Sequence, residues 1–138
     1  MIKLKIGNPK EKNKELIELI KNVQINQFYL NNQKDFRDLI LSNIQKSDSV
    51  LDLGKGMREK FNMIDCSKLE TLDVNEYDDY PDIICDLCGE INDDLKNRYD
   101  KIICLAVLEH VYNPFKAIEN ITKLLKDGGK VYGMVPYL

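Results

Sequence analysis

Short apolar runs bounded by polar and turn residues dominate the chain from residue 49 onward. Several of these runs are apolar at both odd and even positions, which is typical of strands in a parallel sheet that is covered on both faces. We therefore predict strands at residues 49–54, 69–74, 82–87, 100–108 and 130–135.

Apolar residues at helical spacing mark three other segments. Residues 12–23 and 34–46 are predicted to form two amphipathic helices ahead of the strands. Residues 114–129 show the same spacing between the last two strands, with a proline suited to the first turn and two glycines suited to the end. Strands alternating with helices predict an α/β fold, a three-layer sandwich with a mainly parallel sheet of about five strands.

Two connections between the predicted strands are short. Residues 75–81 are too few and too polar for a crossover helix, and residues 88–99 have room only for a short helix. The length of 138 residues fits a single domain. Within it we expect a helical extension over residues 1–48 and a reduced α/β core over residues 49–138.

Charge and hydropathy exclude several classes of protein. The net charge is -3, and residues 51–100 hold six basic and 14 acidic side chains, which is unlike a nucleic-acid binder. No run approaches the ~18 apolar residues of a membrane span, and the first residues lack the apolar segment of a secretory signal. We therefore expect a cytoplasmic protein that binds neither nucleic acid nor membrane.

Four cysteines offer little for a metal site. Cys85 and Cys88 form a lone CxxC pair, and neither Cys66 nor Cys104 supplies a second pair at zinc-ribbon spacing. Cys85 and Cys104 lie in apolar runs, as small buried hydrophobes do. We predict no metal, and thiols that stay reduced in a cytoplasmic setting.

A glycine-containing turn follows the first predicted strand. Gly54 and Gly56 let the backbone of this segment, the glycine turn (residues 54–56), take a positive φ or approach a ligand. A bare structural turn explains the two glycines equally well. Asp73 ends the next strand, 21 residues after Asp52, where an acid is placed to accept hydrogen bonds from ribose hydroxyls. Asp86 ends the third strand, at the edge where open α/β sheets bind ligands.

At this point the sequence resembles a known family. Over residues 49–136 it is similar to class I, Rossmann-like S-adenosylmethionine-dependent methyltransferases, most closely to the broad type 11 group. The matching motifs, in chain order, are LDLGKG (51–56), Asp73 in TLDV, Asp86 in CDL, LEHV (108–111) followed by Asn113 and Pro114, and LLKDGG (124–129).

The resemblance implies a role for the first two motifs. Asp52, Gly54 and Gly56 would form the turn around the methionine part of S-adenosylmethionine. Asp73 would bind the ribose hydroxyls of the same cofactor.

The later motifs would complete the site. Asp86 and the backbone of Leu87 would meet the adenine, and the backbone of Leu105 and Ala106 would face the amino-acid portion and the transferred methyl group. His110 would lie on the rim, where it is a candidate catalytic base because its pKa is ordinarily near neutrality.

The sequence departs from the family pattern in three places. Lys55 and Arg58 stand where the family's turn has small residues, and Arg58 would either crowd the cofactor or point outward. The chain ends at Leu138, after the fifth predicted strand, whereas the family's sheet has seven. We therefore expect a truncated chain, or a second copy or partner chain that covers the exposed edge.

Two other functions stay open beside methyl transfer to a small-molecule acceptor. An NAD-dependent dehydrogenase also uses a glycine turn and an acid, and Tyr112 with Lys116 matches its Tyr-x-x-x-Lys pair. Against this, the turn lacks the full G-x-G-x-x-G pattern. A non-catalytic methyltransferase-like binding module is the second alternative, favoured by Arg58 and the early end of the chain.

Overall fold

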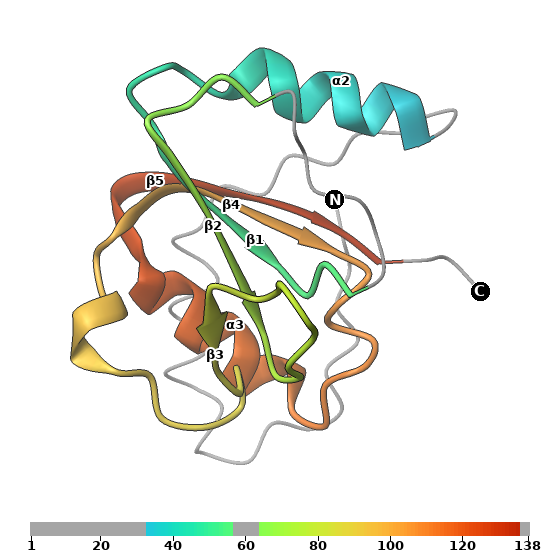
Figure 1. Ribbon diagram of the computed structural model, residues 1–138, viewed down its shortest axis with the longest axis vertical. Helices are drawn as coiled ribbons and strands as arrows, with labels where there is room; N and C mark the ends of the chain where they lie inside the picture. The colour runs from blue at the N-terminus through green and yellow to red at the C-terminus, as the bar shows by residue number, and fades with distance from the viewer. Residues whose placement is uncertain (1–32, 57–63, 136–138) are drawn as a thin grey trace, which may run out of the picture. The chain divides into compact units, whose positions relative to one another are not determined.

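Five strands pair into one parallel sheet in the computed structural model, which describes residues 33–56 and 64–135. Their order across the sheet is β3-β2-β1-β4-β5, and each neighbouring pair is parallel (Figure 1). This confirms the predicted Rossmann-like α/β fold. The strands are β1 (Ser49–Leu53), β2 (Lys68–Asp73), β3 (Ile83–Ile84), β4 (Tyr99–Leu105) and β5 (Leu125–Met134).

The described helices are α2 (Gln33–Asn43), the short 3₁₀ helix η2 (Asp93–Leu95) and α3 (Pro114–Leu124). The predicted helix over residues 12–23 lies outside the described residues. The chain divides into two compact units, Met1–Arg37 and Asp38–Leu138. A boundary at residue 48 stays a prediction. Across the described ranges, no helix is long and apolar enough to cross a bilayer.

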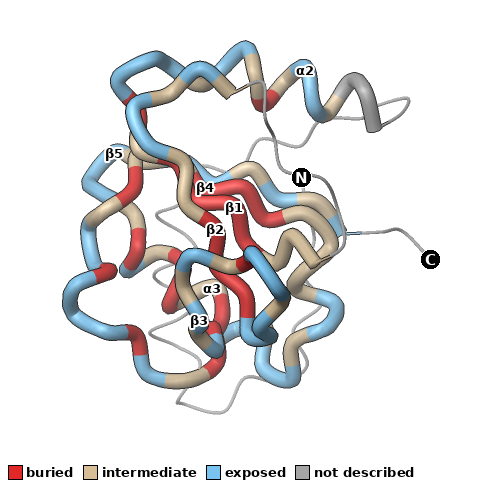
Figure 2. Tube along the Cα trace, viewed as in Figure 1, coloured by how far each residue is buried: buried red, intermediate tan, exposed pale blue. Residues whose placement is uncertain are grey.

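The central strands are buried on both faces (Figure 2). Leu51 and Leu53 of β1 belong to the same apolar cluster as Ile121 and Leu124 of α3, so α3 packs against one face of the sheet. Val50 alternates with these residues and is also fully buried. Each such aliphatic side chain contributes about 1.5–3 kcal/mol when it leaves water.

The third strand is shorter than the predicted 82–87 because two aspartate side chains bind neighbouring backbone. The Asp82 carboxylate accepts hydrogen bonds from the N–H and the hydroxyl of Thr71, at 2.8 and 2.7 Å. Strand pairing therefore begins only at Ile83. Beyond Ile84, the Asp86 carboxylate accepts from the N–H of Cys88 at 2.8 Å and turns the chain.

The boundary between α3 and β5 differs from the prediction of a helix that continues to Gly128 and Gly129. The helix ends at Leu124, and β5 begins with the next residue. Its last carbonyls are bound by a remote segment: Arg98 N–H donates to Leu124 O at 3.0 Å, and Asn97 N–H donates to Lys123 O at 2.9 Å. Because these bonds satisfy the helix end, no glycine cap is required.

Gly128 and Gly129 instead allow the irregular backbone at the start of β5. Gly128 has a φ of +77° in the stretch where the register between β4 and β5 shifts. A Cβ on Gly129 would lie 2.9 Å from Lys126 O and 3.2 Å from Asp100 O, both backbone atoms. The two strands can therefore approach each other here only without a side chain at position 129.

The Asp100 carboxylate joins the first residues of three neighbouring strands. Its Oδ2 accepts from the N–H of Ser49 at 2.8 Å, from the Ser49 hydroxyl at 2.9 Å and from Lys126 Nζ at 3.0 Å. The Ser49 N–H, opposed by partial burial and assisted by Lys126, lowers the pKa of Asp100 from an ordinary 3.8 to about 2.

Asp100→Asn is expected to reduce the pH dependence of stability in acid. Since the folded-state pKa is depressed, the carboxylate stabilises the protein above about pH 4 and loses this effect as the pH falls toward 2. We expect about 1–2 kcal/mol, after solvent screening, to be missing from the variant at neutral pH and little at pH 2. Urea unfolding across this range measures the difference, and an equal pH dependence of stability in the two proteins would contradict this role of the Asp100 carboxylate.

Gly129→Ala is expected to destabilise the protein by about 1–3 kcal/mol, because the new methyl group would meet backbone atoms that cannot move away. Gly133→Ala in the same strand is the matched control, since its Cβ would approach no atom closer than 3.8 Å. Its effect should stay within about 0.5 kcal/mol. Equal midpoints for the two variants in urea would show that the close approach at residue 129 has no consequence.

Candidate functional site

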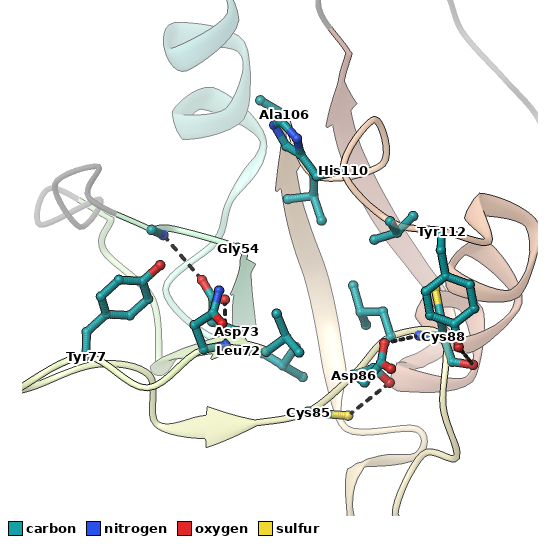
Figure 3. Close-up of a pocket in the computed structure, with 16 residues that line it drawn as sticks. Gly54, Leu72, Asp73, Tyr77, Cys85, Asp86, Cys88, Ala106, His110 and Tyr112 are labelled. Carbon is teal, nitrogen blue, oxygen red and sulfur yellow. Dashed lines mark hydrogen bonds between the residues drawn. The ribbon is translucent and has the colours of Figure 1, made fainter.

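A cleft of about 450 Å³ opens at the carboxyl ends of the strands (Figure 3). Its walls come from the glycine turn, the end of β2 and the loops that follow β3 and β4. Open parallel sheets bind ligands at this edge. The predicted site residues that line it are Gly54, Gly56, Asp73, Asp86, Leu87, Ala106 and His110.

The glycine turn requires both of its glycines for conformation. Gly54 and Gly56 have φ values of +57° and +55°, in the left-handed region that side chains disfavour. Gly54 N–H donates to Leu72 O at 2.8 Å, which ties the turn to β2. A Cβ on Gly54 would lie 2.6 Å from Val107 Cγ2, so the turn also touches the loop after β4. Three walls of the cleft therefore meet at Gly54.

Asp73 ends β2 and presents its carboxylate beside the glycine turn. Its Oδ2 accepts from the Tyr80 hydroxyl at 2.8 Å and from Gly56 N–H at 3.4 Å, and its Oδ1 accepts from Asn75 N–H at 3.1 Å. A carboxylate has about four acceptor positions, so these three contacts leave capacity for a ligand hydroxyl. Asp73 and the glycine turn, which lie far apart in the sequence, are thus in contact in the structure.

The loop after β3 is held by one side chain of α3. Asn120 is fully buried, and its Nδ2 donates to Leu87 O at 2.7 Å and to Gly89 O at 2.8 Å. The Leu87 carbonyl is therefore bound to the helix, while the residue itself lines the cleft. Asp86 lines the same wall. Its carboxylate accepts a hydrogen bond from the N–H of Cys88, which holds the turn after β3.

The loop after β4 supplies the remaining wall. β4 ends at Leu105, three residues before the predicted end, because Ala106 takes a φ of +53°. Ala106 lines the cleft but its N–H is donated to Met134 O at 2.8 Å, whereas Leu105 is absent from the lining. The His110 side chain is 77% exposed at the rim, with Nε2 3.8 Å from Glu109 Oε1.

Two residues of the first motif lie away from the cleft lining. Asp52 is fully buried within β1, one residue before the strand ends. Lys55 places its Nζ 4.4 Å from the centre of the Tyr80 ring and 3.3 Å from Gly56 O, outside the lining. Its charge is thereby turned onto an aromatic ring instead of into the cleft. Arg58 lies outside the described residues.

All four cysteines are free thiols, and Cys85 and Cys88 line the cleft. Burial, assisted by the charge of Asp86, raises the pKa of the Cys85 thiol, so it stays protonated at neutral pH. Among the described residues, no group of three His, Cys, Asp or Glu side chains is arranged to hold a metal ion. The Cys85 thiol therefore acts as an uncharged wall group here.

Sequence reasoning missed two residues that shape the cleft. Tyr80 lies in a polar loop and Asn120 in a helix, and neither stands in a pattern that points to a site. Asn120 offers one weak signal, an amide on the otherwise apolar face of α3. Both act through hydrogen bonds to groups far away in the sequence or across a loop, which the pattern of residue types does not reveal.

The strand order and the cleft together define a Rossmann-like α/β protein with an open cleft at the carboxyl edge of its sheet. A glycine turn follows β1, a carboxylate ends β2, and the two meet at the carboxyl edge of a parallel sheet. Sequence comparison carries the identification further. Residues 24–138 match the sequence model of a methyltransferase domain family, and the chain belongs to that family. The resemblance to class I methyltransferases is thereby confirmed.

A curated relative covers part of the chain. The ubiquinone biosynthesis O-methyltransferase of Dechloromonas aromatica (strain RCB) is 33% identical over 66 residues, which are 48% of this chain and 27% of that protein. The chain thus spans about a quarter of this relative's length.

Solved structures share the fold. A proposed methyltransferase from Bacillus halodurans C-125 superimposes with a TM-score of 0.57 and 17% identity, over 71% of this chain and 49% of that one. A proposed zinc-dependent alcohol dehydrogenase from Rhodobacter sphaeroides gives 0.62 and 18%, over 78% and 48%. At such identities the likeness concerns the fold alone, so the family match and the cleft must separate the two activities.

Asn120→Ala is expected to destabilise the protein by roughly 2–3 kcal/mol, because the carbonyls of Leu87 and Gly89 lose a buried donor. Glu119→Ala is the control in the same helix, since its ion pairs with Lys116 and Lys123 are exposed and should contribute below about 1 kcal/mol. Urea unfolding measures both. A loss for Asn120→Ala no larger than that for the control would mean that water replaces the amide.

Proposed function

We propose that this chain provides the cofactor-binding core of an S-adenosylmethionine-dependent methyltransferase that acts on a small molecule bearing a hydroxyl group. The observation that carries the proposal is the meeting of Asp73 with the glycine turn, Gly56 N to Oδ2 at 3.4 Å, inside a cleft of about 450 Å³. Family membership supports the reaction class, and the cleft supports the cofactor.

The charge of the cleft suits a sulfonium cofactor. Asp73 and Asp86 both line it, and no Lys or Arg belongs to the lining among the described residues. Lys55, the nearest cation in the glycine turn, is held over the Tyr80 ring instead. Two carboxylates in a described lining that contains no Lys or Arg favour a positively charged ligand group.

The walls of the cleft suit a nucleoside. Val74, Val107 and Val111 give apolar surface against which a flat base can lie. Asp73 supplies the acceptor that ribose hydroxyls require, since its carboxylate keeps unused acceptor positions. The residues present therefore fit the cofactor that the family implies.

The main task of the chain's own residues would be to align the cofactor with the acceptor, and only one of them would take part in proton transfer. S-adenosylmethionine, when bound, supplies an electrophilic methyl group. Asp73 and the glycine turn would hold its nucleoside and fix its direction, and such alignment can contribute roughly 7–11 kcal/mol to the rate. His110, at the rim with Glu109 Oε1 3.8 Å from its Nε2, would accept the proton that a hydroxyl acceptor loses.

The acceptor is proposed from two observations. The relative from Dechloromonas aromatica is an O-methyltransferase, and methyl transfer to a hydroxyl oxygen releases the hydroxyl proton, which calls for a base such as His110. Tyr112, 79% exposed, stands beside the same opening and offers an aromatic surface to a small molecule. The absence of Lys and Arg from the described lining argues against a nucleic-acid acceptor.

A dehydrogenase is disfavoured by the partners of its candidate pair. The Tyr112 hydroxyl contacts Cys88 O at 3.4 Å, while Lys116 Nζ binds Glu119 Oε1 at 3.1 Å. Tyr112 also precedes α3, which begins at Pro114, so the two side chains do not share a helix face. The Tyr-x-x-x-Lys match therefore has no catalytic geometry here.

Calorimetric titration tests the proposal directly. The wild-type chain should bind S-adenosylhomocysteine and give no heat with NAD. Asp73→Asn should weaken S-adenosylhomocysteine binding by about tenfold to a hundredfold, the worth of a hydrogen bond to a charged acceptor.

Glu70→Gln is the matched control for Asp73→Asn. Glu70 lies in the same strand and also accepts a tyrosine hydroxyl, from Tyr99 at 2.7 Å, but it stands outside the cleft lining. Its variant should bind like the wild type. Heat with NAD alone, or no heat with S-adenosylhomocysteine at millimolar concentration, would contradict the proposed cofactor.

A further inference from the structure

We propose that Tyr80 is a positioning residue for nucleoside recognition: its hydroxyl sets the orientation in which the Asp73 carboxylate receives the ribose hydroxyls. This inference rests on the proposed function, because it concerns how the cofactor's sugar is recognised. It adds a residue from the loop between β2 and β3, which contains none of the matched motifs.

The carboxylate of Asp73 is held from two directions through one oxygen. The Tyr80 hydroxyl donates to Oδ2 at 2.8 Å, and Gly56 N–H of the glycine turn donates to the same atom at 3.4 Å. Oδ1 receives the N–H of Asn75 at 3.1 Å. With Oδ2 engaged by two protein donors, Oδ1 retains the greater capacity for a ligand hydroxyl.

The Tyr80 ring is itself held in place by the surrounding loop. Tyr80 is 5% exposed, and its backbone exchanges hydrogen bonds with Tyr77, from Tyr77 N to Tyr80 O at 2.7 Å and from Tyr80 N to Tyr77 O at 3.4 Å. The two rings lie with centroids 5.4 Å apart. A side chain fixed by packing on several sides can fix a neighbour in turn, which is the requirement for a pre-organised site.

Lys55 connects this ring to the glycine turn. Its Nζ lies 4.4 Å from the ring centre of Tyr80 and 3.3 Å from Gly56 O. The same aromatic ring therefore contacts the turn through its face and Asp73 through its hydroxyl. This arrangement places a cation in the turn without directing its charge toward a sulfonium.

The hydroxyl stays a donor over the whole pH range in which the protein would work. Burial, assisted by the hydrogen bond to Asp73 and by its charge, raises the pKa of Tyr80 well above the ordinary value of 10. The Tyr80–Asp73 contact is thus a constant feature of the site and not a pH switch.

The test compares two ligands on Tyr80→Phe. S-adenosylhomocysteine should bind the variant about tenfold more weakly than the wild type, the factor that corresponds to one net hydrogen bond. An analogue of this ligand that lacks both ribose hydroxyls should bind the two proteins within about twofold, because it makes no use of the Asp73 carboxylate. A purely structural role would weaken both ligands alike.

Tyr99→Phe is the matched control. Tyr99 is 1% exposed and donates to Glu70 Oε2 at 2.7 Å, so this variant also loses a tyrosine–carboxylate bond, one that is partly buried and lies at the amino end of β4. It should lose stability as Tyr80→Phe does and leave both affinities unchanged. If Tyr80→Phe unfolds in plain buffer, the titrations are made with trimethylamine N-oxide, which favours the folded chain.

The outcomes separate the two proposals. Equal weakening of both ligands by Tyr80→Phe, or no weakening of either, overturns the role of Tyr80 while leaving cofactor binding by the wild type in place. Failure of the wild-type chain to bind S-adenosylhomocysteine overturns the proposed function and the role of Tyr80 with it. Selective loss of the hydroxyl-bearing ligand supports both.

Discussion

Hydrogen bonding of β1 between β2 and β4 brings together the glycine turn, the end of β2 and the loop after β4. Leu53, the last residue of β1, pairs with Leu72 on one side and with Cys104 on the other. Because the strands are parallel, the residues that follow them emerge at one edge of the sheet. Asp73 and Val107, 34 positions apart in the sequence, thereby become neighbours of the same glycine turn.

Side chains bonded to backbone replace the helices that a larger α/β domain would use between its strands. Asp82 fixes the backbone before the third strand, Asp86 turns the chain after it, and Asn120 attaches the following loop to α3. Such loops bury little apolar surface, so their conformation depends on satisfied polar groups. The order of the cleft therefore rests on a few hydrogen bonds, and the Tyr80–Asp73 contact holds the carboxylate that is proposed to bind the ribose.

The predictions from residue pattern succeeded where local signals and tertiary structure agree. β1 and β2 lie within one residue of their predicted bounds, because runs that are apolar on both faces have one way to be buried. The end of α3 was predicted wrongly. Its carbonyls at Lys123 and Leu124 are bound by Asn97 and Arg98, and no local signal announces a cap that comes from the remote turn before β4.

By itself the sequence determined the α/β class, the glycine turn and the acid at the end of β2. Hydrophobic periodicity, the succession of strands and helices along the chain, and turn residues are all local properties of the sequence. Only the tertiary structure decided that Asp52 is buried in the sheet, that Lys55 turns onto an aromatic ring and that Tyr80 holds Asp73. The physical reason is range. A hydrogen bond or a ring contact acts over a few ångströms, and which side chains come that close is set by packing in three dimensions.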